Sequence, residues 1–449
     1  MSVAVVGGGL AGITAALALA DAGRDVSLYE GRGWLGGLTH SYRHGEIEVD
    51  NGQHVFLRCC EAYRRLLARL GVTDRVALQP RLSIPVRSAA TGRTARLRRA
   101  PLPAPAHLAG SLLRYSPLRP GQRLRFIQAA LALRRVDPSD PATDEQSFGD
   151  WLSAHGQSPR AVSALWDLIG VATLNAPAPH ASLALAATVF QIGLLTKASA
   201  GDIGWSLVPL RRLHGEPALQ HLSAAGARVY TGARVESVRP RGDRWTIGVR
   251  GDEHVVDQVV LAVPPAAAQR LLPAGLPFPP GWAEQLGSSP IINAHVVYDR
   301  PVLDGPFLAT VESPAQWIFD RTAQAGEAVP AGGQYIAVSL SAADDLVDLP
   351  TAQLREMLVP ELAKLLPAAR GAGVLDFFVT RERHATIRQG PGSGRLRPPP
   401  GAVAPGLAIA GAWTATGWPA TMEGAVRSGE AAAAAVLSTV EHVPAEVAR

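Results

Sequence analysis

The fold of this chain is decided near its start, by residues 3–12, which read VAVVGGGLAG. Val3 to Val6 form a short continuous apolar run, as in a buried parallel strand, and glycines follow directly. An apolar helical pattern then continues to Gly23, and residues 26–29 form the next apolar run. A strand, a glycine turn, a helix and a second strand in this order predict a βαβ unit with parallel strands.

The glycines of this turn have the spacing G-x-G-x-x-G, which lets the backbone approach a pyrophosphate at the positive end of the following helix. Glu30 stands at the end of the second strand, where a carboxylate can bind both ribose hydroxyls and repels a 2′-phosphate. The motif in this context predicts a bound dinucleotide that lacks a 2′-phosphate. The expected contacts are Gly7, Gly9, Leu10, Ala11, Gly12 and Glu30.

The length of 449 residues exceeds the size at which a single hydrophobic core usually stops growing, so two closely packed domains are expected. A content of 47% hydrophobic and 18% charged residues, with 45 glycines, fits an α/β globule and excludes a disordered or fibrous chain. The net charge of +5 identifies no partner by itself.

Arginines crowd one stretch of the chain, where they are interleaved with Leu, Pro and Ala. A solvated face and attraction to anionic lipid headgroups are two equally good interpretations of this stretch. Nucleic acid is not an expected partner, because the sequence has none of the standard nucleic-acid-binding motifs. The arginines concerned are Arg93, Arg96, Arg98, Arg99, Arg114, Arg119, Arg123 and Arg125.

Cysteine usage and apolar runs indicate the compartment. Cys59 and Cys60 are the only cysteines, and adjacent residues offer neither a long-loop disulfide nor a metal-ligand spacing. A reducing cytoplasm and no metal are therefore expected. Glycines break the first apolar run, and the longest one, Ala181 to Leu195, contains Gln191 and is short for a transmembrane helix. We expect a cytoplasmic protein, either soluble or peripheral on the inner face of the cell membrane.

The residues after Glu30 extend the dinucleotide motif. Arg32 and the pair Gly36-Gly37 follow it, and this extension resembles the flavin-containing amine oxidase and carotenoid desaturase superfamily, whose usual pattern is E-x-R-x-x-x-G-G-R. The resemblance implies FAD as the cofactor, in preference to NAD. Val235 matches the position whose backbone holds the adenine in that superfamily, although a core valine would look the same from the residues alone.

Residues 407–429 resemble the motif with which this superfamily closes over its flavin. A helix predicted from Pro419 to Val440 would aim unsatisfied N–H groups at the flavin N1 and O2 edge, where reduction places negative charge. The resemblance assigns Gly411 and Met422 to the cofactor.

Three positions near these motifs are not the superfamily's usual residues or have a second interpretation. Leu38 stands where the superfamily has a phosphate-contacting Arg, and Ala412 stands where it has Asp or Glu. Glu423 is interpreted as a first-turn carboxylate that stabilises its own helix, in preference to a catalytic group.

Within the superfamily, residues 48–55, 156–175 and 414–429 resemble the hydroxysqualene dehydroxylases, the squalene-associated FAD-dependent desaturases of bacterial squalene and hopanoid biosynthesis. The resemblance implies reductive removal of the allylic hydroxyl of hydroxysqualene to give squalene. Reduced FAD would be the hydride donor. An unidentified electron donor would then reduce the oxidised FAD again. Such an enzyme needs a general acid, a dry apolar channel and good positioning of the isoprenoid over the flavin.

His54 is the candidate for the general acid, since an unperturbed imidazole titrates near neutral pH. Gln53 beside it would orient the hydroxyl or the flavin. The sequence is equally consistent with a role of both residues in hydrogen bonds to the flavin or in holding a turn. Asp50 is expected to be structural. Four tryptophans are candidates for the channel wall or for core packing: Trp34, Trp166, Trp413 and Trp418.

Two further functions stay open from the sequence. One is an oxidising relative, a carotenoid-type desaturase or an amine oxidase, although an amine oxidase is expected to show a flavin-facing Lys and Lys is scarce here. The other is a flavin-stabilised prenyl-lipid carrier without redox turnover.

We therefore expect an α/β fold in which a Rossmann-type FAD-binding domain is assembled from separated segments. A substrate domain of antiparallel sheet plus helices would be inserted between them, with strands near residues 290–298 and 334–340, whereas a strand at residues 255–263 would belong to the FAD-binding domain. The expected FAD-binding parts are residues 1–78, 205–265 and 395–449. The expected substrate parts are residues 79–204, mostly helical and membrane-facing, and residues 266–394.

Overall fold

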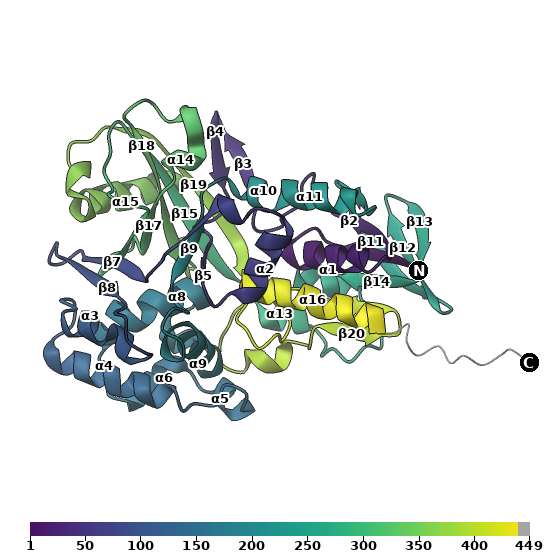
Figure 1. The fold of residues 1–449 in the computed structure, drawn as a ribbon, viewed down its shortest axis with the longest axis horizontal. Helices are drawn as coiled ribbons and strands as arrows, with labels where there is room; N and C mark the ends of the chain where they lie inside the picture. The colour runs from purple at the N-terminus through teal and green to yellow at the C-terminus, as the bar shows by residue number, and fades with distance from the viewer. Residues whose placement is uncertain (439–449) are drawn as a thin grey trace, which may run out of the picture.

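The structure is a computed structural model, and it describes residues 1–438. Two large sheets organise it, one of six strands in the order β10-β2-β1-β14-β21-β20 and one of seven in the order β19-β15-β18-β17-β16-β7-β8. Figure 1 shows the two sheets side by side, with a lobe of helices α3 to α9 below the larger one.

The six-stranded sheet is parallel except at one edge. The parallel strands are β10 Arg228–Tyr230, β2 Asp25–Tyr29, β1 Ser2–Val6, β14 Gln258–Leu261 and β21 Leu407–Ile409, and the antiparallel edge strand is β20 Gly401–Ala404. In β1, Val3 faces a different layer from Ala4, and both are fully buried. Strands buried on both faces explain the continuous apolar runs of the sequence.

Helices cover one face of this sheet and a small second sheet covers the other. The helices are α1 Leu10–Asp21, α2 Glu61–Arg69, α10 Leu210–Leu213, α11 Gly215–Ala224 and α16 Met422–Ser438. The opposite layer consists of β11 Val235–Arg241, β12 Arg244–Val249, β13 Asp252–Val256, α12 Pro265–Leu271 and α13 Trp282–Leu286. Figure 1 shows α1 and α16 lying side by side.

The seven-stranded sheet forms the second body of the molecule. Its strands are β19 Val374–Thr386, β15 Ser289–Tyr298, β18 Gln334–Ser341, β17 Trp317–Asp320, β16 Phe307–Val311, β7 Ser83–Ser88 and β8 Thr94–Arg98. All neighbours pair antiparallel except β16 and β7. Helix α15 Thr351–Leu365 buries its apolar side against one face of this sheet. On the other face lie the hairpin β3 Ser41–His44 with β4 Ile47–Asp50, and α14 Thr322–Ala325.

The helical lobe packs against the β7–β8 end of the larger sheet. Its helices are α3 Ala109–Leu113, α4 Pro120–Leu133, α5 Pro141–Glu145, α6 Phe148–Ala154, α7 Pro159–Ala161, α8 Asp167–Leu174 and α9 Leu183–Phe190. They share one apolar core with residues of β7, β8 and β16. A small sheet of β5 Val55–Leu57, β9 Ile203–Ser206 and β6 Val76–Leu78 connects the lobe to α2.

The predicted α/β class is confirmed, and so are the parallel βαβ unit and the antiparallel pairing of residues 290–298 with 334–340. Two element predictions were wrong. The strand expected at residues 255–263 is divided between β13 and β14, which belong to different sheets. The last helix begins at Met422 instead of Pro419, and residues 439–440 of its predicted range lie outside the described residues. The domain boundaries stay predictions.

Candidate functional site

The turn after β1 needs glycine at two of its positions. Gly7 has a φ of +107°, and a Cβ there would lie 2.3 Å from the carbonyl oxygen of Ala262. A Cβ on Gly12 would lie 1.9 Å from the carbonyl oxygen of Gly7. Gly9 is different, because its Cβ would meet no atom closer than 3.9 Å. The turn is therefore packed from behind at Gly7 and Gly12 and open at Gly9, where a ligand can approach the backbone.

Helix α1 begins in this turn with uncapped amides. Its first backbone hydrogen bond runs from the N–H of Ile13 to the carbonyl of Gly9 at 2.9 Å, and no side chain caps the helix. The N–H groups of Ala11 and Gly12 consequently have no partner among residues 1–438. Such amides at a helix N-terminus favour an anion.

Glu30 lies at the end of β2 beside the turn. Its Oε2 accepts from the N–H of Gly8 at 2.7 Å and its Oε1 from the N–H of Arg32 at 2.7 Å. Each oxygen keeps a further lone pair, so the carboxylate can still accept from two hydroxyls. The N–H of Ala233 donates to the Glu30 carbonyl at 2.8 Å, which places the buried Val235 at the start of β11 next to this end of the site.

The second glycine pair lies directly over the first turn. The N–H of Gly36 donates to the carbonyl of Gly8 at 2.8 Å, and Gly36 has a φ of +113°. A Cβ on Gly37 would lie 2.9 Å from the Cα of Gly9. Only glycine lets the two loops approach this closely, so the sequence motif and its extension form one wall.

Two side chains of this loop face outward. The Arg32 guanidinium lies 5.9 Å from the Trp34 ring and donates from Nη1 to the carbonyl of Gly37 at 3.4 Å. Leu38 is 40% exposed, so no buried contact replaces the arginine that the motif usually has here.

The carboxyl end of β21 leads to a second helix start at the same edge of the sheet. The N–H of Gly411 donates to Ser428 Oγ at 2.8 Å, which ties this turn to α16. The first main-chain bond of α16 runs from Ala425 to Thr421 at 2.9 Å. The N–H groups of Met422 and Glu423 therefore have no partner in the described part of the chain. Two helices, α1 and α16, thus present free amides at one edge of one sheet.

Glu423 stabilises another helix and not its own, which corrects the expectation from the sequence. Its carboxylate is fully buried and accepts from the N–H groups of Ala62 at 3.1 Å and Tyr63 at 2.8 Å, in the first turn of α2. Arg427 neutralises it at 2.7 Å. Cys59 and Cys60, both free thiols, directly precede α2.

Arg397 holds the loop between β21 and α16, a role that no motif around this residue indicates. Its Nη2 donates to the carbonyls of Thr414 at 2.7 Å and Trp418 at 2.8 Å. Longer bonds, both of 3.3 Å, reach the carbonyls of Ala412 and Trp413. Burial lowers the pKa of Arg397 to about 10, which the charge of Asp144 partly opposes. The guanidinium stays charged at neutral pH and fixes the loop by carbonyl dipoles alone.

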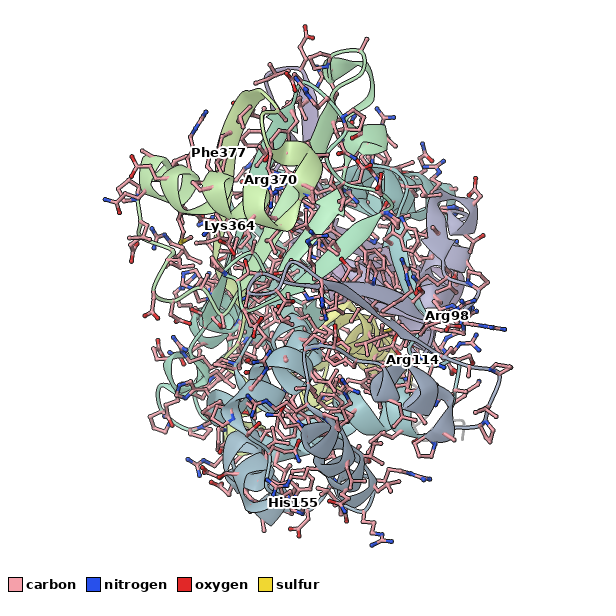
Figure 2. The ribbon with its side chains drawn as sticks, turned by 90° about the vertical axis from the view of Figure 1, so that its left-hand side faces the viewer. Arg98, Arg114, His155, Lys364, Arg370 and Phe377 are labelled. Atoms are coloured by element: carbon pink, nitrogen blue, oxygen red, sulfur yellow. The ribbon has the colours of Figure 1, made fainter. Side chains whose placement is uncertain are left out.

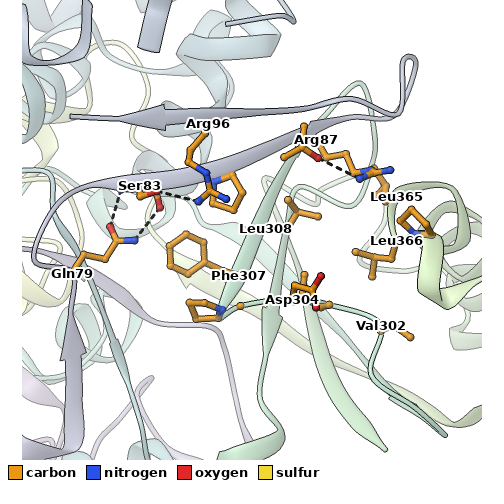
Figure 3. Close-up of a pocket in the computed structure, with 16 residues that line it drawn as sticks. Gln79, Ser83, Arg87, Arg96, Val302, Asp304, Phe307, Leu308, Leu365 and Leu366 are labelled. Atoms are coloured by element: carbon orange, nitrogen blue, oxygen red, sulfur yellow. Dashed lines mark hydrogen bonds between the residues drawn. The ribbon is translucent and has the colours of Figure 1, made fainter. Parts of the chain in front are cut away.

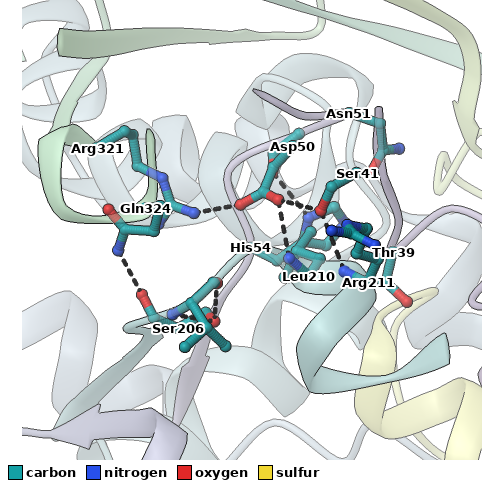
Figure 4. Close-up of polar contacts among 12 residues, drawn as sticks. Thr39, Ser41, Asp50, Asn51, His54, Ser206, Leu210, Arg211, Arg321 and Gln324 are labelled. Carbon is teal, nitrogen blue, oxygen red and sulfur yellow. Dashed lines mark hydrogen bonds and ion pairs between the residues drawn. The ribbon is translucent and has the colours of Figure 1, made fainter. Parts of the chain in front are cut away.

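Asp50 joins three separate segments of the chain (Figure 4). Its Oδ1 accepts from Ser41 Oγ at 2.6 Å and from the N–H of Leu210 at 2.9 Å. Its Oδ2 forms an ion pair with Arg321, and the two side chains are 3% and 9% exposed. The structural role predicted for Asp50 agrees with these contacts, which join β4 to the starts of α10 and α14.

His54 is half-buried and has a fixed tautomer. Its Nδ1 lies 3.0 Å from the carbonyl of Gly52, and since a carbonyl only accepts, Nδ1 carries the hydrogen and a neutral ring has a bare Nε2. Desolvation lowers the pKa of His54, more than the Gly52 carbonyl and the charges of Asp50 and Glu382 raise it. The neutral imidazole therefore predominates at pH 7.

Gln53 and Glu382 complete this part of the site. Gln53 Oε1 is buried without a hydrogen-bond partner in residues 1–438, so a donor from a ligand would satisfy it. Glu382, on β19, accepts at Oε1 from Asn51 Nδ2 at 3.1 Å. The same amide group donates to the carbonyl of Leu38 at 2.8 Å. The sequence did not single out Glu382, because 328 residues separate it from His54 and only the sheet brings them together.

The four tryptophans divide between core and surface. Trp166 is fully buried and donates from Nε1 to Gln157 Oε1 at 3.0 Å. Trp413 is 4% exposed and lies 5.0 Å from the Trp282 ring. Core packing is therefore confirmed for these two. Trp34 is 47% exposed, and Trp418 contacts the Arg427 guanidinium at 4.9 Å.

Comparison with known proteins agrees with this geometry. Residues 10–437 match the family described as flavin containing amine oxidoreductase. The chain is 31% identical over 466 aligned positions to the hydroxysqualene dehydroxylase of Rhodopseudomonas palustris, with 97% of this chain and 98% of the relative covered. It is 24% identical to the zeta-carotene desaturase of Zea mays, with 99% and 84% covered. An oxidoreductase from Methanosarcina mazei has the same fold, with a TM-score of 0.75, 17% identity, and 98% and 100% covered.

Proposed function

The chain belongs to the flavin containing amine oxidoreductase family and is an FAD-dependent oxidoreductase, and on that basis we propose that it removes the allylic hydroxyl of hydroxysqualene to give squalene. The observation that carries the proposal is its end-to-end similarity to the Rhodopseudomonas palustris hydroxysqualene dehydroxylase, at 31% identity. A reductive reaction of this kind serves squalene and hopanoid biosynthesis.

The free polar groups of the structure fit FAD. The diphosphate would lie on the unpartnered amides of α1, with the open side of Gly9 allowing close approach. The adenosine end would lie by Glu30 and Val235, and the amide of Met422 would face the flavin. The further contacts that we propose are Gly7, Leu10, Ala11, Gly12, Arg32, Gly36, Gly37 and Gly411.

When it is bound and reduced, FAD supplies the two electrons with which a carbon–hydrogen bond replaces the carbon–oxygen bond. The protein has to bind a long apolar alcohol, exclude water and protonate the departing oxygen. Ionisation of that bond is feasible, because an allylic cation is delocalised.

We assign to His54 the role of the acid that protonates the departing oxygen. The bare Nε2 of its neutral form accepts a hydrogen bond from the substrate hydroxyl, and the protonated form donates to the leaving oxygen. The carboxylates of Asp50 and Glu382 favour that protonated form. Gln53 orients the hydroxyl or the flavin through its unpartnered Oε1. Because desolvation lowers the pKa of His54, the rate of the chemical step should rise as the pH falls toward that pKa, below 6.5.

The zeta-carotene desaturases among the relatives support a second candidate, an oxidation that would use the flavin in the opposite direction. Anaerobic enzyme, photoreduced and mixed with hydroxysqualene, distinguishes the two. The dehydroxylase reoxidises its flavin and forms squalene, detected by mass. A desaturase leaves the reduced flavin unchanged with hydroxysqualene, and its oxidised form is reduced by ζ-carotene.

We further propose that the helical lobe contacts an anionic membrane from the cytoplasmic side. None of the helices in residues 1–438 is both long and apolar enough to cross a bilayer. The lobe and its neighbouring loop expose large apolar side chains, and Figure 2 shows Arg98 and Arg114 of the same part of the chain on the outer surface. These are Leu102 at 50%, Leu113 at 62%, Leu124 at 59% and Leu131 at 44%.

A flotation assay with phosphatidylglycerol vesicles at low salt tests this surface. The double change Leu113→Ser and Leu124→Ser should abolish co-flotation, because each leucine contributes buried apolar area in the interface. Leu219→Ser is the matched control, since Leu219 is 43% exposed on α11, away from the lobe. Equal loss in the control would refute the assignment of the surface.

A further inference from the structure

A cavity of about 400 Å³ opens between the β7–β8 hairpin, the loop 302–308 and the end of α15 (Figure 3). It is separate from the site described above, because no residue of the glycine turn, of the loop 30–37 or of residues 411–422 lines it. Its size falls within the range of ligand sites in proteins, roughly 300–1,000 Å³.

One wall of the cavity is basic. Ser83, Pro85 and Arg87 alternate along β7 and share a face of the hairpin with Thr94 and Arg96 of β8, because side chains alternate between the faces of a strand. Arg87 is paired with Thr94 across the hairpin and Arg96 with Pro85, so the two guanidinium groups are diagonal neighbours.

Both arginines have donors left over. Arg87 Nη1 donates to Thr94 Oγ1 at 3.2 Å, but its Nε is buried and has no partner within residues 1–438. Arg96 Nη1 donates to Ser83 Oγ at 3.1 Å. Neither arginine forms an ion pair with any described residue. The two hydroxyls that accept these bonds keep their own protons to donate. Two guanidinium groups, of Arg87 and Arg96, and two hydroxyl groups, of Ser83 and Thr94, thus line one wall with donors.

The opposite wall is apolar. Phe307 and Leu308 of β16 and Leu365 and Leu366 at the end of α15 line it, and these side chains are themselves packed into the protein core, at most 7% exposed. Asp304 is the one acid among the lining residues, and it pairs with neither arginine. A buried donor such as Arg87 Nε is costly to leave unsatisfied, unless an acceptor from a ligand compensates it.

We propose that this cavity binds the phosphate group of a ligand through its basic wall. A phosphate offers three or more acceptor oxygens, which suits two guanidinium groups and two hydroxyls better than the two oxygens of a carboxylate do. The phosphate can come from a lipid headgroup or from a free phosphate ester, and in both cases charged phosphate oxygens accept from the two arginines.

Calorimetry on the FAD-loaded protein tests the proposal, since bound FAD fills the diphosphate site. Octyl phosphate should bind at one site per chain, and octyl glucoside, of equal chain length but neutral, should not. Arg87→Gln and Arg96→Gln should each weaken octyl phosphate at least about tenfold, because each removes charge-assisted hydrogen bonds. Asp304→Asn should strengthen it, because a like charge is removed.

Arg98→Gln is the matched control. Arg98 lies on the same strand and face as Arg96 and is exposed, but it does not line the cavity. The Arg98→Gln change should alter the affinity for octyl phosphate less than about twofold, because solvent and salt screen a charge that lies outside the cavity. If Arg98→Gln weakens octyl phosphate as much as the cavity variants do, or if octyl glucoside binds equally well, the proposal is overturned. Arg87→Lys, which keeps the charge, and an unchanged FAD content confirm that the variants fold.

A second arm identifies the source of the phosphate. If Arg87→Gln also lowers binding to vesicles of phosphatidylcholine with phosphatidylglycerol, the ligand is a lipid headgroup. If vesicle binding is unchanged while glycerol 3-phosphate competes with octyl phosphate, it is a free phosphate ester. Either result supports the phosphate site, and neither depends on the dehydroxylase reaction.

Discussion

Arg321→Met should destabilise the protein strongly, because it leaves half of a buried carboxylate without a donor. Asp50 is 3% exposed at its side chain, and both of its other donors, Ser41 Oγ and the N–H of Leu210, bond to Oδ1. Oδ2 accepts from Arg321 alone among the residues that the structure describes. Removal of one partner of a buried ion pair typically costs about 3–5 kcal/mol, against a total stability of about 5–15 kcal/mol for a protein.

The double variant Arg321→Met with Asp50→Asn provides the internal control. An amide carries no charge, and its oxygen can still accept from Ser41 and Leu210, so the double variant should regain about 1–3 kcal/mol over Arg321→Met alone. Urea unfolding followed by tryptophan fluorescence and by release of FAD measures both variants. If the two single changes simply add, Asp50 and Arg321 are not coupled and the reasoning is wrong.

Three more predictions follow from the site and the helical lobe. Arg397→Met should lower FAD affinity by at least about tenfold, measured by equilibrium dialysis, since four loop carbonyls lose their donor; unchanged affinity would refute it. Gly9→Ala should leave the fold intact and weaken FAD, because its Cβ meets open space where the diphosphate is proposed, and unaltered FAD binding would exclude that location. Burial raises the pKa of Asp167 to about 6, above its unfolded value near 3.9, so the folded protein loses stability as the pH rises from about 4 to 6. Asp167→Asn should therefore gain roughly 1–3 kcal/mol relative to the parent between pH 4 and pH 8, and a pH-independent difference would contradict this.

The glycine turn and Glu30 could be predicted because their spacing is local. Gly7, Gly9 and Gly12 lie within six residues, and the strand before and the helix after them set their geometry. The superfamily resemblance extended the prediction to Gly36, Gly37 and the start of α16. In each case a short segment specifies both its own conformation and its contacts.

Long-range polar contacts could not be predicted in this way. Asp50 and Arg321 are 271 positions apart, and Glu423 accepts from amides 360 and 361 positions away. An acid at a helix start has a local role by default, so Glu423 was assigned to its own helix. The periodicity of a sequence shows which face of an element is buried and does not show which distant element covers it.

The carboxylate of Glu423 makes the folding of one helix depend on the position of another. α16 starts where the flavin is proposed to lie, and one residue later it supplies the acceptors for the first amides of α2. Any rearrangement of that first turn when the cofactor leaves would uncap α2 and expose the adjacent Cys60, whose thiol pKa burial and Cys59 hold well above its usual value. The rate at which a thiol reagent labels this chain should therefore report how much of the protein carries its cofactor.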